Sequence, residues 1–423
     1  MSSEISVEAH PPTKPIILHP GDSLTKRQRL VYVLVLGALV ALGPFTIDLY
    51  LPAFPAIATV FDASDAAIQL TLTATTVGFG LGQLFVGPWS DKVGRRTPLL
   101  VATTLHIAAS LGVALAHDLG LIGFFRVLQG IGAAGGSVVA MAMVRDLFGG
   151  HPLVRMLARL ALVTGLAPIL APVIGSQLLQ VMEWRGIFWV LMGYGIVVLA
   201  LAWFFIIETL PPARRRDVGH STARDRYRAL FTDRVFVGVA IVGAMNFSSL
   251  FAYLAASSFL FQDVYGMDAQ QFGLLFGVNS LGLAVCSQIS SRVMRRVGPQ
   301  WVVAVTLTGM FLAAAAIAVF ALLGGGLWSV LIPLFVLISL TGATFPAIQV
   351  AALAHHGKEA GTAASLLGAV NFGLAGLISP IVGWLGIDSA LPMASVQLAT
   401  LGVAILVLWI VVRPRTVPSI AGT

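Results

Sequence analysis

Two charged residues lie inside long apolar stretches of the chain. Asp48 is the acidic residue that falls well within such a stretch, about one turn from its end, and Arg126 is the basic residue so placed. A charge in lipid is costly, and such residues commonly face a partner or an ion pathway. Asp48 is therefore a candidate to bind and release a proton, and Arg126, at a comparable depth, is a candidate to pair with it.

Each of these residues also has a structural interpretation. Asp48 could be an interfacial residue that caps or hydrogen-bonds the backbone before Pro52. Arg126 could donate hydrogen bonds to backbone carbonyls and so fix helix packing.

The composition explains why these two residues are set in lipid. Apolar residues make up 57% of the 423 residues and charged residues 10%, and the mean hydropathy is +0.92, which leaves too little polar surface for a water-soluble globule. A membrane-spanning helix needs about 20 apolar residues. Twelve such segments are predicted, at 29–53, 66–89, 98–116, 119–144, 156–181, 186–207, 234–261, 268–291, 300–321, 327–353, 361–385 and 391–412.

The positions of the cations predict the topology. Twenty-three of the 25 Lys and Arg residues lie on one side of the membrane, within or next to the two tails and the even-numbered loops, whereas the odd-numbered loops hold only Arg185. The positive-inside rule then places both termini in the cytoplasm of a bacterial inner-membrane protein. The net charge of +7 has this topological cause and does not indicate nucleic-acid binding.

A polar stretch divides the chain into two halves. We expect a disordered cytoplasmic tail at 1–28, a six-helix half at 29–207, a cytoplasmic linker at 208–233, a second six-helix half at 234–412 and a short tail at 413–423. The triplet KVG at 92–94 aligns with RVG at 296–298, six segments later, as a weak internal repeat. Two related six-helix halves that bind substrate near the midplane are typical of secondary transporters.

Several motifs carry a family resemblance. Residues 87–96, GPWSDKVGRR, look like the signature of the loop between helices two and three of the major facilitator superfamily. Three further segments resemble the Bcr/CflA drug-resistance family of drug:H⁺ antiporters: IDLYLPAFP at 47–55, RVLQGIG at 126–132 and VRDLF at 144–148. The resemblance covers nearly the whole chain after the tail and implies the all-α fold of that superfamily.

The resemblance also implies two groups of site residues. The loop motif consists of Gly87, Asp91, Gly94 and Arg95. A separate hypothesis, beyond the resemblance, is that Arg145 and Asp146 join Asp91 and Arg95 in an ionic latch at the inner gate. The fifth segment carries Gly165, Pro168, Pro172 and Gly175 on one helical face and resembles the antiporter motif of drug:H⁺ exchangers, although Ala171 and Ser176 replace glycines of the strict motif. Ordinary small-residue helix packing is the alternative interpretation of that face.

The functional expectation is proton-coupled efflux of small hydrophobic or amphipathic drugs of the chloramphenicol or bicyclomycin type. The alternative is a proton-coupled uptake symporter for a small metabolite. Candidate substrate contacts are Tyr50, Asn246 and Tyr253. No catalytic constellation, metal spacing or nucleotide-phosphate loop is apparent, so the sequence predicts a transporter that works as a monomer, with the proton gradient in place of a cofactor.

Overall fold

The structure, a computed structural model, describes residues 21, 24–212, 215, 223–354 and 360–416. Within these residues twelve helices are long and apolar enough to cross a membrane, which confirms the predicted number. The spanning helices are α1 (Lys26–Asp48), α3 (Asp65–Val93), α4 (Arg96–Leu115), α5 (Leu119–Leu147), α6 (Gly150–Leu178), α7 (Trp184–Phe205), α9 (Arg234–Phe259), α10 (Ala269–Val297), α11 (Pro299–Leu322), α12 (Leu327–Leu353), α13 (Ala360–Trp384) and α14 (Leu391–Val407).

Short polar side chains begin several of these helices. The Ser64 hydroxyl accepts a hydrogen bond from the third amide of α3, and the Asp118 carboxylate does the same for α5 at 2.9 Å from the Leu121 nitrogen. Asp268 and Gln271 form a reciprocal capping box at α10. These caps satisfy amides that have no partner within the helix, and so they fix where each apolar segment becomes helical.

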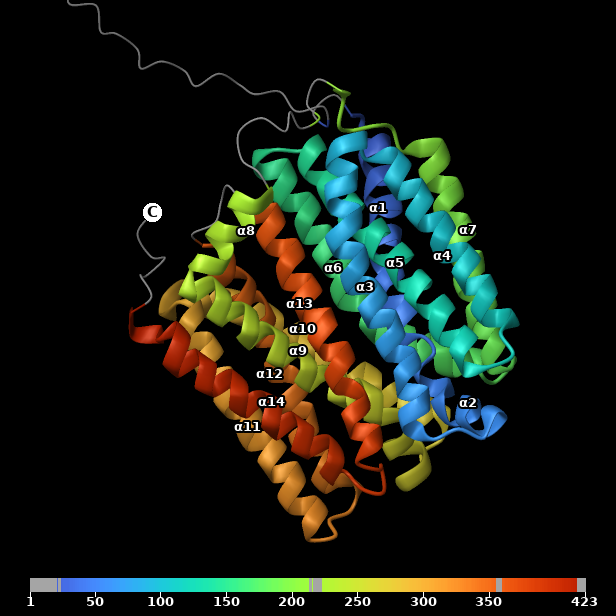
Figure 1. The fold of residues 1–423 in the computed structure, drawn as a ribbon, viewed down its shortest axis with the longest axis vertical. Coiled ribbons are helices and arrows are strands. Elements are labelled where there is room, and N and C mark those ends of the chain that lie inside the picture. The colour runs from blue at the N-terminus through green and yellow to red at the C-terminus, as the bar shows by residue number, and fades with distance from the viewer. Residues whose placement is uncertain (1–20, 22–23, 213–214, 216–222, 355–359, 417–423) are drawn as a thin grey trace, which may run out of the picture.

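The spanning helices form two groups that follow one another in the chain. Helices α1 to α7 make the N-terminal half and α9 to α14 the C-terminal half (Figure 1). The start of α1 and the end of α14 lie on one face of the bundle, named here the terminal face. The opposite face carries the short helix α2 (Phe54–Phe61) and is named the α2 face.

The predicted internal repeat has a geometric counterpart. Gly94 ends α3 with φ +106° and Gly298 ends α10 with φ +85°, values that favour glycine. Each glycine turns the chain directly into the next spanning helix, α4 or α11. The two halves therefore use the same type of turn at equivalent positions.

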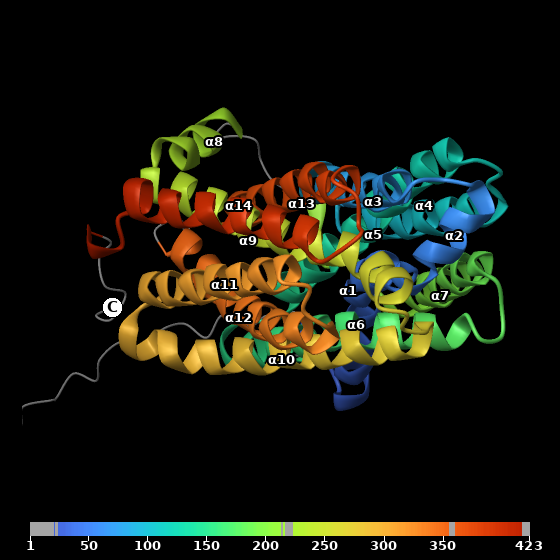
Figure 2. The same cartoon turned by 90° about the horizontal axis from the view of Figure 1, so that it is seen from below.

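The halves meet through two helix pairs, α3 with α13 and α6 with α10 (Figure 2). Several hydrogen bonds join the halves near the α2 face, including Gln262 Nε2 to the Pro52 carbonyl at 3.2 Å and the Thr73 and Ser379 hydroxyls at 3.4 Å. The aromatic rings of Phe54 and Phe259 also meet there, with centroids 5.7 Å apart. The halves are therefore closed against each other at the α2 face.

Within the N-terminal half, α3 and α5 pack backbone against backbone. A Cβ on Gly78 would overlap the Val127 carbonyl, and a Cβ on Gly130 would overlap the Thr75 carbonyl. Gly82 meets Ile131 in the same way. Close approach through small residues is a common means of joining helices in membranes. We call this contact the glycine seam.

Some elements differ from the sequence-based expectation. The first segment was expected to run to residue 53, but α1 ends at Asp48. A short 3₁₀ turn (Leu51–Ala53) then leads into α2. Pro52 has no backbone amide to donate the next helical hydrogen bond, which explains why α1 stops there. The region expected as a linker contains a helix, α8 (Ala223–Thr232). Wider π turns (Leu260–Val264 and Leu408–Val412) extend α9 and α14, and a short 3₁₀ turn (Pro414–Thr416) follows. Most of the expected N-terminal tail lies outside the described residues, and α1 begins within it at Lys26.

Candidate functional site

Asp48 is the last residue of α1 and is 6% exposed. Its carboxyl forms no hydrogen bond or ion pair with the residues that the structure describes. It interacts electrostatically with Tyr50 of its own half and with Tyr253 of α9, in the other half. The proposed proton site therefore lies where the two halves come together near the α2 face.

Arg126 lies in α5 and is fully buried. Its Nη1 donates to the Thr46 carbonyl at 2.9 Å and to Gln129 Oε1 at 2.7 Å. The guanidinium carbon is 3.9 Å from the centre of the Tyr50 ring, a cation–π contact. Its Nε and Nη2 have no hydrogen-bond partner among the described residues.

The expected ion pair between Asp48 and Arg126 is absent from this conformation. Arg126 instead contacts the Thr46 carbonyl of α1, two residues before Asp48, and the Tyr50 ring in the turn that follows α1, two residues after Asp48. The structural alternative, an arginine bound to a backbone carbonyl, is thus realised in part. Because Nε and Nη2 have no described partner, Arg126 can donate hydrogen bonds to a second acceptor.

The three candidate substrate contacts are all buried. The Tyr50 hydroxyl is 3.3 Å from that of Thr71, and the Tyr253 hydroxyl accepts a hydrogen bond from Asn279 Nδ2 at 3.1 Å. Asn246 is fully buried, and neither atom of its amide has a partner among the described residues. Tyr50 is thus part of the Arg126 environment, whereas Asn246 retains its full capacity to bind a polar group.

The loop motif forms a compact ionic cluster on the terminal face. Arg95 Nη1 lies 2.6 Å from Asp91 Oδ1 and its Nε lies 2.8 Å from Asp146 Oδ2, so one guanidinium joins the ends of α3 and α5. These carboxylates hold the pKa of Arg95 above its usual value despite its burial. Gly94 provides the turn. A Cβ on Gly87 would lie 3.4 Å from Val138 Cγ1 of α5, an ordinary contact distance, so packing at this position does not require glycine.

Two features of this cluster differ from the expected latch. Arg145 is exposed and forms no described contact with it. The partners Arg95, Asp91 and Asp146 all belong to the N-terminal half, so the described cluster fastens helices within one half.

Glu208, just beyond α7, completes the cluster and was not predicted from the sequence. Its carboxylate accepts hydrogen bonds from the backbone amides of Arg95 and Leu210 at 2.8 Å and from Arg96 at 3.1 Å. Burial acts to raise the pKa of the Glu208 carboxyl, but these amides and the nearby Arg215 outweigh it, so the pKa is lowered. Glu208 therefore acts as the N-terminal cap of α4.

The motif expected in the fifth span lies in α6, and its residues face two different neighbours, the end of α1 and helix α10. Gly175 packs against the Leu49 carbonyl at the end of α1, where a Cβ would overlap it. Pro168 faces the other half, since its carbonyl is 3.5 Å from the Ser280 hydroxyl of α10, and Pro172 lies beside Gly273 of α10. A Cβ on Gly165 would meet no atom within 4 Å.

A second buried polar group was missed in the sequence. Gln129 Nε2 donates to the Ser110 hydroxyl at 2.8 Å, and Ser110 in turn contacts His106, all three fully buried. In the sequence, Ser110 and His106 looked like ordinary members of an apolar segment, and Gln129 belonged to the RVLQGIG motif without an assigned role. The spacing of four between His106 and Ser110, and of three between Arg126 and Gln129, would have placed each pair on one helical face.

Gln69 of α3 was also missed in the sequence. It is fully buried, its Nε2 donates to the Ala255 carbonyl of α9 at 3.0 Å, and its Oε1 accepts from the Gly383 amide of α13 at 2.9 Å. One side chain of the N-terminal half is therefore hydrogen-bonded to two helices of the C-terminal half. Gln69 lies close to the start of its span and carries no charge, so neither hydropathy nor charge marks it.

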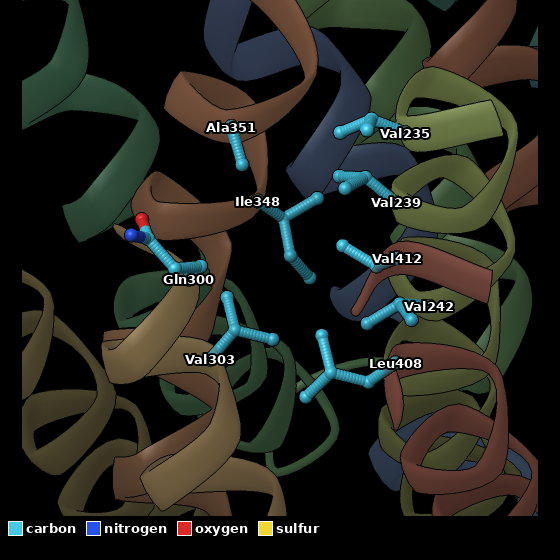
Figure 3. A pocket seen from close by; sticks show the side chains of 9 residues that line it. All are labelled: Val235, Val239, Val242, Gln300, Val303, Ile348, Ala351, Leu408 and Val412. Carbon is cyan, nitrogen blue, oxygen red and sulfur yellow. The ribbon is translucent and has the colours of Figure 1, made fainter. Parts of the chain in front are cut away.

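The described residues hold no cluster of His, Cys, Asp and Glu that could bind a metal. A small apolar cavity lies in the C-terminal half between α9, α11, α12 and the π turn that extends α14 (Figure 3). Its volume of about 10 Å³ accommodates no more than a water molecule. It is therefore not a binding site for a drug-sized molecule.

Comparison with known proteins places these features in a family. The family model described as Major Facilitator Superfamily matches residues 34–380. The chain is 35% identical over 378 residues to the uncharacterized MFS-type transporter YdgK of Bacillus subtilis (strain 168), covering 89% of this chain and 94% of that protein. It is 30% identical over 382 residues to a bicyclomycin resistance protein homolog of Haemophilus influenzae, covering 90% and 95% respectively.

Solved structures support the same fold. A bacterial homolog of the human lysosomal transporter Spinster, in an inward-facing and unoccupied conformation, superposes with a TM-score of 0.69 at 15% identity, covering 93% of this chain and 98% of that one. The human organic anion transporter MFSD10 gives a TM-score of 0.64 at 19% identity, covering 91% and 100%. The chain belongs to the major facilitator superfamily, as a membrane transporter related to drug-resistance proteins.

Proposed function

We propose that this transporter exports small hydrophobic or amphipathic drugs, of the chloramphenicol or bicyclomycin type, in exchange for protons. The observation that carries the proposal is the position of Asp48, a buried carboxyl without a described hydrogen-bond partner at the junction of the two halves. An ionised carboxyl in such a place is costly, so a site of this kind is suited to bind and release a proton as its surroundings change.

In this proposal the closed α2 face and the environment of Asp48 change together. When the halves separate there, Asp48 is exposed to the medium on that side and can exchange a proton. Arg126 contacts the chain on either side of Asp48, through Thr46 in α1 and Tyr50 after it, and its Nε and Nη2, which have no described partner, can donate to the carboxylate when it forms. The pair is then made in one conformation and broken in the other.

The distribution of cations assigns the two faces to the two sides of the membrane. We propose that the terminal face, which carries the ionic cluster of Arg95, is cytoplasmic, because cations concentrate on the cytoplasmic side of bacterial membrane proteins. The α2 face is then external. The proton gradient supplies the energy, since each elementary charge that crosses 100 mV contributes about 2.3 kcal/mol.

The drug class rests on named relatives and on the chemistry of the buried residues. A relative that aligns over 90% of this chain is named as a bicyclomycin resistance protein homolog, and others are named as the multidrug resistance protein MdtL. Asn246 offers a donor and an acceptor without adding charge, which fits a neutral polar group on an otherwise apolar molecule. A proton-coupled uptake symporter is the second candidate, because the same carboxyl can couple inward movement.

The test is drug-triggered proton movement in sealed, energised inverted vesicles. Addition of a chloramphenicol-like drug should release protons from vesicles that contain the wild type, and Asp48→Asn should abolish the release because its amide cannot exchange a proton. Asp62→Asn is the matched control, since Asp62 is an exposed residue at the end of α2, on the same face.

The outcomes separate the candidates. Release by the wild type and by Asp62→Asn, but not by Asp48→Asn, supports antiport through Asp48. If no drug releases protons in verified vesicles while a metabolite drives proton uptake in right-side-out vesicles, the chain is a symporter. Release that persists in Asp48→Asn would place the proton site elsewhere.

A further inference from the structure

We infer that Gln129, Ser110 and His106 are positioning residues that set the orientation of the Arg126 guanidinium. The inference rests on the proposed function, in which Arg126 takes part in coupling. It concerns residues of α4 and α5 that contact neither Asp48 nor the other half in the described contacts. All of them are fully buried.

The hydrogen bonds run in one direction, because the first member can only donate. Arg126 has no acceptor, so Gln129 must turn its carbonyl oxygen toward it, at 2.7 Å from Nη1. The amide nitrogen of Gln129 then points to the Ser110 hydroxyl, 2.8 Å away, which must accept. Ser110 donates its own hydrogen to the His106 carbonyl, also at 2.8 Å.

The imidazole of His106 also contacts Gln129. Its Nδ1 lies 3.4 Å from the Gln129 backbone carbonyl, which can only accept, so a neutral ring places its hydrogen on Nδ1. Its Nε2, then an acceptor, lies 3.5 Å from the Ser110 hydroxyl, but the single hydrogen of that hydroxyl goes to the nearer His106 carbonyl. The side chain and the backbone of Gln129 are thus both tied to α4.

Helix packing gives this chain little room to rearrange. A Cβ on Gly132 of α5 would lie 2.6 Å from the His106 backbone nitrogen, and a Cβ on Gly195 of α7 would lie 3.3 Å from the His106 ring. The three helices therefore enclose the imidazole. Polar groups buried in this way are costly to leave unpaired, which favours a single arrangement.

The arrangement matters because Arg126 has two kinds of donor. Nη1 is occupied by Gln129 and by the Thr46 carbonyl, whereas Nε and Nη2 are without described partners. A fixed Gln129 keeps the free donors directed away from α4. Without the anchor at Ser110, the Gln129 amide can turn, and the guanidinium loses the constraint that sets its rotation.

The experiment compares Ser110→Ala with Thr103→Val. Thr103 is a matched control because it lies in the same helix, is equally buried, and donates only to the Leu99 carbonyl one turn away. In protein reconstituted in nanodiscs and labelled with ¹⁵N-arginine, the side-chain resonance of Arg126 is assigned by its loss in Arg126→Lys. Ser110→Ala should speed hydrogen exchange of the Arg126 guanidinium by about tenfold or more, and Thr103→Val should leave it unchanged.

The same variants are tested for drug-triggered proton release. Faster exchange together with release reduced about tenfold in Ser110→Ala alone supports the inference and the proposed function. Faster exchange with normal release leaves the positioning role standing and removes Arg126 from coupling. Unchanged exchange in Ser110→Ala and in a second variant, Gln129→Leu, overturns the inference whatever the transport result.

Discussion

Replacing Gln69 with leucine should open the α2 face. Leucine keeps the apolar bulk of the side chain but removes both hydrogen bonds that Gln69 makes across the halves, to Ala255 at 3.0 Å and from Gly383 at 2.9 Å. Each such bond contributes a net 0.5–1.5 kcal/mol or so, which gives about 1–3 kcal/mol for the two. The population closed at the α2 face should fall by about 5- to 150-fold relative to the open one.

The assay is the distance between spin labels on the two halves. Asp62, at the end of α2, and Leu323, which follows α11, are exposed at the α2 face on opposite halves. The single cysteine, Cys286, is replaced by serine so that labelling is specific. Pulsed electron spin resonance on Gln69→Leu should show a larger fraction of long distances than on the parent protein.

Gln397→Leu is the control. Gln397 is an equally buried glutamine whose Nε2 donates to the Ser249 carbonyl at 3.4 Å, within the C-terminal half. Its loss should lower thermal stability without changing the distance distribution. An unchanged distribution in Gln69→Leu, or an equal shift in Gln397→Leu, would refute the reasoning that Gln69 holds the halves together.

Two further predictions concern packing and pH. Gly175→Ala should lower the melting temperature of the purified protein, because the new methyl group would overlap the Leu49 carbonyl at a cost of about 1–3 kcal/mol. Gly165→Ala, in open space on the same helix, should leave the melting temperature unchanged. Equal effects of the two substitutions would contradict this reasoning. Glu208→Gln should also lower the melting temperature near neutral pH. Because the pKa of Glu208 is lowered in the folded protein, its stabilisation is present above the unfolded value of about 4.3 and is lost as the pH falls through the folded value, so wild type and variant should converge in acid. A difference independent of pH would show that the charge is not the cause.

The sequence was sufficient to predict the twelve spans, because apolar length alone determines where a helix can cross lipid. It did not predict α2 or α8, which are too short for that criterion. It also placed the end of α1 five residues late, since Leu49 to Ala53 remain apolar although the α-helix has ended before Pro52.

The candidate site was predicted less completely, for a geometric reason. Hydropathy gives the depth of Asp48 and Arg126 along the membrane normal but not the direction in which each side chain points around its helix. At similar depth, Arg126 turns to Thr46, Tyr50 and Gln129 rather than to Asp48. Neutral polar residues such as Gln69 and Ser110 barely change the hydropathy of a span, so their roles become visible only when the neighbouring helices are in place.

The glycine seam has a mechanical consequence. Since Gly78 and Gly130 bring the backbones of α3 and α5 into direct contact, neither helix can slide or roll past the other without a collision. The two helices must therefore rotate as one rigid lever, with Gln69 near one end of α3 and Arg126 on α5. A tilt that withdraws Gln69 from α9 and α13 carries Arg126 through the same angle, so opening the α2 face and displacing the buried cation are a single movement.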